Sequence, residues 1–170
     1  MAEKLSLRDY QRDLAQRLRA AEGSRTSSLL ALQVGPEGWL VDLVDAGEVI
    51  PVPVVTPVPL TKQWFRGMAN IRGNLYSVVD FPAFLGGTPV AQTEQSRLLL
   101  LGERFRLGAA LLVDRSLGLR NPAQLKQREA GAAAPAPWLK AEYEDEEGRV
   151  WKELDVPQLV QQQEFLTVGA

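Results

Sequence analysis

The 170-residue sequence contains no cysteine and no histidine. Without cysteine there are no disulfides, thiol nucleophiles or iron–sulfur clusters, and the usual ligands of zinc sites are absent. Without histidine the commonest general base is missing. The sequence offers no nucleophile–base pair and no phosphate-binding glycine loop. We therefore expect a protein that is not an enzyme and that holds no metal or cofactor.

Charge and hydrophobic patterning are those of an ordinary globular domain. The net charge is −2 and the isoelectric point is near 5.3, so no strong positive field favours nucleic acid. The longest apolar runs, such as Leu98–Leu101, are far too short to span a bilayer, and the N-terminus lacks the apolar core of a signal peptide. We expect a cytoplasmic protein without direct membrane insertion.

Residues 1–27 are interpreted as an N-terminal helix and a linker. Ser6 can cap a helix that ends at Glu22, before Gly23. Apolar residues three and four positions apart form one narrow stripe: Leu7, Tyr10, Leu14 and Leu18. A single helix of this length is marginal in water. The favoured interpretation is that it docks on its own domain, and the alternative is that it is a partner-binding arm.

The chain from residue 28 to residue 166 is predicted to be mainly β. Apolar runs predict strands at 29–34, 39–44, 75–79, 98–101, 105–113 and 150–154. Pro51, Pro53 and Pro57 make the segment 48–58 an edge or irregular strand, because proline lacks an N–H. A short helical piece is expected within 121–137. Asp155 and Pro157 predict the start of a terminal helix.

The two halves of this region, at about 28–86 and 97–160, repeat each other. Six positions from Leu29 to Asp45 match positions 69 residues further on, and seven from Gly73 to Leu85 match at an offset of 75. The second block carries glycine, an aromatic residue and Asp-x-Pro at fixed spacing. Such a period fits two similar small β-barrels, which must pack closely because each half alone buries little surface.

The halves differ at their hairpin tips. The first has Asn70-Ile71-Arg72-Gly73 and the second has the acidic Glu144-Asp145-Glu146-Glu147-Gly148. Gly73 occupies a position that needs a positive φ. Because the second half manages without an arginine, the fold does not require Arg72, which favours a functional role for it. The acidic tip lacks the spacing of a calcium loop and is interpreted as a solvated turn.

The stretch from Trp64 to Gly86, WFRGMANIRGNLYSVVDFPAFLGG, resembles the CheW family of chemotaxis coupling proteins. Its most specific part is Gly-x-x-Asn-x-Arg-Gly followed by an apolar strand and Asp80. The resemblance extends over roughly residues 28–160. It implies two five-stranded SH3-like β-barrels around a shared hydrophobic core. The N-terminal helix and the C-terminal tail are similar to those of the PilI branch, which serves the chemosensory system of type IV pili and twitching motility.

The resemblance also implies a function and a set of interaction residues. Members of the family are non-enzymatic adaptors in signalling arrays. They couple the cytoplasmic tip of a chemoreceptor to the regulatory domain of a histidine autokinase. The family's exposed arginine maps to Arg72, the glutamate that faces it maps to Glu48, and Asn70 and Gly73 map to the turn. These four are the candidate protein-interaction residues.

One alternative from another functional class is a nucleic-acid-binding module with a small OB or SH3-like barrel. Such a barrel needs a basic face with aromatic side chains for base stacking. The aromatic candidates are Trp39, Trp64, Phe65, Tyr76 and Trp151. The acidic isoelectric point argues against this alternative.

Overall fold

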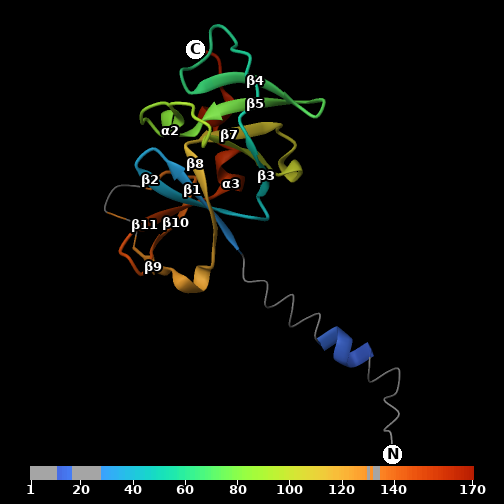
Figure 1. Cartoon of the computed structure of the whole chain (residues 1–170), viewed down its shortest axis with the longest axis vertical. Helices are drawn as coiled ribbons and strands as arrows, with labels where there is room; N and C mark the ends of the chain where they lie inside the picture. Colours follow the sequence, from blue (N-terminus) through green and yellow to red (C-terminus); the bar gives the residue numbers. More distant parts are fainter. Residues whose placement is uncertain (1–10, 17–27, 130, 132–134) are drawn as a thin grey trace, which may run out of the picture.

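A computed structural model describes residues 11–16, 28–129, 131 and 135–170, and Figure 1 shows its two β-sheets. The six-stranded sheet has the strand order β8-β1-β2-β11-β10-β9. Its strands are β1 (Leu29–Val34), β2 (Glu37–Asp42), β8 (Arg115–Arg120), β9 (Lys126–Arg128), β10 (Leu139–Glu144) and β11 (Val150–Leu154). All of its pairs are antiparallel except β2 with β11.

The five-stranded sheet has the order β3-β6-β7-β5-β4. Its strands are β3 (Ala46–Pro51), β4 (Phe65–Ile71), β5 (Asn74–Asp80), β6 (Arg97–Leu101) and β7 (Ala109–Val113). Its one parallel pair is β5 with β7. Strand β3 lies at an edge, as the prolines of the segment 48–58 predict. Short helical elements complete the fold: α2 (Phe81–Phe84), η1 (Glu103–Phe105), η2 (Pro122–Gln124), α3 (Val156–Leu159) and α4 (Gln163–Leu166).

The internal repeat is visible as a common strand order, but the sheets do not coincide with the halves 28–86 and 97–160. The hairpin β1–β2 belongs to the first half and lies in the six-stranded sheet with β8–β11 of the second. The hairpin β6–β7 of the second half lies in the five-stranded sheet with β3–β5 of the first. The two halves have therefore exchanged hairpins, and neither sheet is complete without both.

This exchange explains why several strands are apolar on both faces. In β1, Leu30, Leu32 and Val34 join the core shared by the two sheets, whereas Leu29 and Ala31 pack inside the six-stranded barrel against Trp151. Strand β6 repeats the pattern: Leu99 and Leu101 face the shared core, and Leu98 and Leu100 face the interior of the other barrel. Successive side chains point to opposite faces of a strand, so both barrels are anchored to one core.

The repeated Asp-x-Pro has the same structural role in both halves. Asp80 is the N-cap of α2 and accepts from the Ala83 N–H. Asp155 is the N-cap of α3 and accepts from the Gln158 N–H. Each aspartate also donates its backbone N–H to a tryptophan carbonyl at 2.7 Å, Asp80 to Trp64 and Asp155 to Trp138. The cap predicted at Asp155 is confirmed, and the cap at Asp80 is its unpredicted counterpart in the first half.

Some expectations need correction. The strand expected at 105–113 begins only at Ala109, because residues 103–105 form a 3-10 turn and Arg106 and Gly108 have positive φ. Strands β4, β8, β9 and β10 were not among the predicted strands. Strand β8 carries Gly118 in its middle, and β9 has three polar residues. Residues 11–16 are helical and exposed, with Leu14 at 45%. Most of the predicted helix, Leu7, Tyr10 and Leu18 included, lies outside the described residues.

Candidate functional site

The tip of the β4–β5 hairpin holds Arg72 in an unusual backbone conformation. Ile71 pairs with Asn74, which leaves Arg72-Gly73 as a two-residue loop. Both loop residues have positive φ, 52° at Arg72 and 84° at Gly73, as a type I′ turn requires. The Asn70 side chain accepts from the Gly73 N–H at 2.9 Å. A long side chain is rare in this region, so the turn presents an arginine where asparagine or glycine is the common choice.

A β-bulge positions the partner of this arginine on β3. Ala46 pairs with Leu101 and Glu48 with Leu100, so Gly47 is the extra residue. Ala46 and Val49 both pack against the shared core, although residues three apart normally lie on opposite faces of a strand. The bulge resolves this conflict. It leaves Glu48 on the face opposite Val49, toward the β4–β5 hairpin.

The two side chains meet in an exposed ion pair. The Arg72 Nη2 lies 2.6 Å from the Glu48 Oε1, with side-chain exposures of 68% and 46%. The hydrogen bond from Arg72 lowers the pKa of Glu48, and the same bond raises the pKa of Arg72. Both groups therefore stay charged at neutral pH. The pair borders a hollow of about 260 Å³ lined in part by Asn74, Tyr76 and Glu103.

The corresponding hairpin of the second half is built differently. At its tip Gly148 has a φ of 81°, and the Asp145 carboxylate accepts from the N–H groups of Glu147 and Arg149. Asp145 also accepts from the indole of Trp151, and these bonds lower its pKa, the indole contributing most. This tip is tied inward to the barrel. In the described part of this tip the arginine, Arg149, bonds the Gln33 side chain on β1 at 2.7 Å and makes no ion pair with a carboxylate like that of Arg72 with Glu48.

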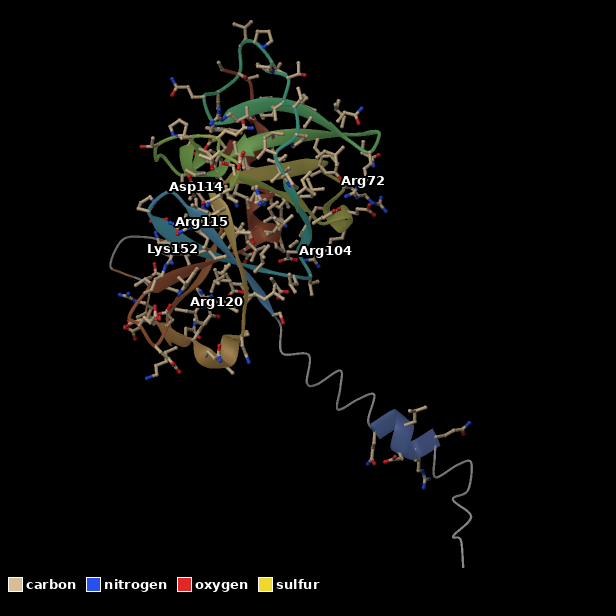
Figure 2. The ribbon with its side chains drawn as sticks, in the orientation of Figure 1. Arg72, Arg104, Asp114, Arg115, Arg120 and Lys152 are labelled. Atoms are coloured by element: carbon tan, nitrogen blue, oxygen red, sulfur yellow. The ribbon has the colours of Figure 1, made fainter. Side chains whose placement is uncertain are left out.

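A second ion pair lies at the same end of the five-stranded sheet and was not predicted. Arg104, from the β6–β7 turn, contacts the Asp45 carboxylate at the β2–β3 corner, and the Gly102 N–H donates to the Asp45 carbonyl at 2.8 Å. Figure 2 shows Arg72 and Arg104 on one side of the domain. The β2–β3 corner that carries Asp45 joins strands of different sheets, so only the tertiary fold brings Asp45 to Arg104.

The aromatic residues that a nucleic-acid binder would need are mostly in the core. Trp39, Phe65 and Trp151 are 3%, 8% and 0% exposed, and the Trp39 ring packs edge-on against Phe81. Side chains this deeply buried offer no face for base stacking. Among the described residues, no group of three or more carboxylates is placed to hold a metal ion. Nor is any helix in the described ranges long and apolar enough to cross a membrane.

The fold and the hairpin motif define the class of protein. The family model of the CheW-like domain matches residues 28–164, and the chain belongs to this family. Protein PilI of Pseudomonas aeruginosa is 30% identical over 100 residues, which cover 59% of this chain and 56% of PilI. The match thus spans little more than half the length of that relative.

A solved structure of the scaffolding protein TtCheW from Thermoanaerobacter tengcongensis has the same fold. The TM-score is 0.66 at 15% identity, over 82% of this chain and 95% of TtCheW. The family and the mainly β fold that the stretch from Trp64 to Gly86 predicts are therefore confirmed. The roles of Glu48, Asn70, Arg72 and Gly73 in binding remain predictions.

Proposed function

We propose that this chain is a non-enzymatic adaptor that couples the cytoplasmic tip of a chemoreceptor to the regulatory domain of a histidine autokinase. The relation to PilI favours an array that controls type IV pili and twitching motility. The adaptor acts in the cytoplasm, and its association with the membrane is indirect, through the receptor.

One observation carries the proposal: the Arg72–Glu48 pair is exposed, yet two backbone irregularities build it. Arg72 sits in the left-handed region and Glu48 follows a bulge. Exposed ion pairs contribute little to stability, and left-handed arginine costs conformational energy. Such an arrangement suits recognition, because a guanidinium is a planar, always-charged fork that can exchange Glu48 for a carboxylate on a partner.

The test combines thermal unfolding with a reconstituted receptor–kinase assay. Arg72→Ala should unfold at the parent temperature but lose receptor control of the kinase. Arg72→Lys should also be impaired, because an ammonium group cannot make the bidentate contact. Titration by NMR should show the Glu48 pKa rising toward its ordinary value in Arg72→Ala, which verifies that the pair existed in solution.

Arg106→Ala is the matched control. Arg106 is also exposed and left-handed, with a φ of 50°, but it makes no ion pair within the described part of the chain. Its replacement should leave receptor control unchanged. If Arg72→Ala unfolds the protein, Arg72 is structural; if both Arg72 variants couple normally, the hairpin does not transmit the signal.

A further inference from the structure

Three exposed apolar side chains surround the point where the chain enters β1. Leu43, Val44 and Leu119 are 41%, 69% and 61% exposed. The Leu43 N–H approaches the Ser28 carbonyl at 3.4 Å, and Leu119 pairs with Leu30 across β8 and β1. We refer to Leu43, Val44 and Leu119 as the entry patch. Leu43 and Leu119 lie opposite Ser28 and Leu30, which flank Leu29, where β1 begins.

The entry patch continues the shared core to the surface. Leu30 pairs with Leu119 on one side and with Val41 on the other, and residues directly opposite each other share a face of the sheet. Leu30 and Val41 belong to the shared core. Leu43 follows Val41 by two residues, which keeps the same face. Leu43 and Leu119 therefore lie at the uncovered margin of a hydrophobic layer, and Val44 follows Leu43 directly in the chain.

The N-terminal segment carries a stripe of apolar residues, and the entry patch is also apolar. Leu7, Tyr10, Leu14 and Leu18 are spaced as one helical face, residues 11–16 are helical, and Leu14 is 45% exposed. Residues 1–27 contain six basic and four acidic side chains, which leaves a net charge of −4 on the rest of the chain. Charge and hydrophobicity both favour contact between the segment and the domain.

The covalent connection directs the stripe to this patch. Residues 17–27 lie between the helical residues and β1, and an extended chain of that length reaches about 36 Å. A short tether gives a local concentration in the millimolar range. Leu75, at 63% exposure, lies in β5 near the tip of the β4–β5 hairpin, where it pairs with Asn70. Two other strongly exposed apolar residues, Val54 at 87% and Leu60 at 89%, lie in the segment between β3 and β4. That segment pairs with the C-terminus at the opposite end of the domain in Figure 1.

We propose that the N-terminal segment docks through Leu7, Tyr10, Leu14 and Leu18 onto the entry patch of its own chain. The docked segment buries the margin of the shared core. The inference concerns this chain's own segment and does not depend on the proposed function.

The absence of cysteine allows a direct test by paramagnetic NMR on the full chain. A nitroxide attached at Ala15→Cys should broaden the amide signals of Leu43, Val44 and Leu119 at least twofold relative to the reduced label. Replacing Leu14 and Leu18 by serine in the same labelled chain should restore these signals. Val44→Ser with Leu119→Ser should do the same, and these two exposed positions should leave the unfolding temperature nearly unchanged.

The matched control is Val54→Ser with Leu60→Ser, which should leave the broadening intact. A mixed sample shows whether the docked segment belongs to the same chain or to a second copy. One chain carries the nitroxide without nitrogen-15 enrichment, and the other is enriched in nitrogen-15 without the nitroxide. Broadening in the mixture would mean that the segment of a second copy covers the patch, and this would overturn the proposal. So would the absence of broadening in the parent, broadening confined to residues near Val54, or broadening that persists in the Val44/Leu119 variant.

Discussion

Gly67 lies in β4 where another segment of the chain crosses it, and Gly67→Ala is a sharp test of the fold. Its φ is +133°, and an added Cβ would be 2.1 Å from the Thr56 carbonyl oxygen and 2.9 Å from the Pro57 Cα. Thr56 and Met68 exchange two backbone hydrogen bonds at 2.8 and 2.9 Å. The crossing segment must withdraw by more than an ångström, which breaks both bonds.

The expected loss can be estimated from these contacts. Two backbone hydrogen bonds contribute about 1 kcal/mol each, and a side chain at this φ costs about 1–3 kcal/mol. The free energy of unfolding should therefore fall by about 3–5 kcal/mol, out of the roughly 5–15 kcal/mol typical of a domain. For a chain of this size the unfolding temperature should drop by about 6–20 °C.

Urea unfolding followed by circular dichroism measures the loss, with Gly35→Ala as the control. Gly35 has a φ of +57° and open space around its missing Cβ, so its replacement should cost only the backbone term, about 1–2 kcal/mol. Equal losses in the two variants would refute the reasoning, because they would show that the contact with Thr56 does not constrain the fold.

Two further predictions concern the buried carboxylates of Asp80 and Glu153 and the groups that bond to them. Asp80 is fully buried and, besides capping α2, accepts from Arg66 Nε at 2.9 Å and the Val90 N–H at 3.0 Å; Asp80→Ala should cost about 3 kcal/mol in chemical unfolding. Asp155→Ala, which loses only the equivalent cap, should cost about 1 kcal/mol, and similar losses at both positions would contradict this account. Burial raises the pKa of Tyr143, and the hydrogen bond that Tyr143 donates to Glu153 raises it further. The hydrogen bond that Lys140 donates to Glu153 raises the pKa of Lys140. When a group has a higher pKa in the folded state than in the unfolded state, its contribution to stability is complete below the unfolded-state pKa. That contribution is lost as the pH rises through the folded-state pKa. Stability should thus decline above about pH 10, and less steeply in Tyr143→Phe; an unchanged slope would exclude Tyr143 as a source of the decline.

Much of the fold was predictable because its signals are local. The apolar run from Leu29 to Val34 predicts β1 with its correct bounds, and Asp155 with Pro157 predicts the start of α3. The site was predictable in part: Gly73 was expected to have a positive φ and does. The positive φ of Arg72 was not expected, because an arginine gives no local signal for it; the Arg-Gly pair in a two-residue hairpin loop was the only clue. Strand β9, three polar residues long, has no periodicity to find.

The sequence by itself determined the repeat, the cap at Asp155, the hairpin turn and the family, because each depends on residue types at fixed spacing. Tertiary structure alone decided that the halves exchange the hairpins β1–β2 and β6–β7, and that Gly47 forms the bulge beside Glu48. A strand that is apolar on both faces fits the centre of either sheet, so its local pattern cannot name its partners. That choice is made by the shared core, where residues about seventy positions apart must pack together at once.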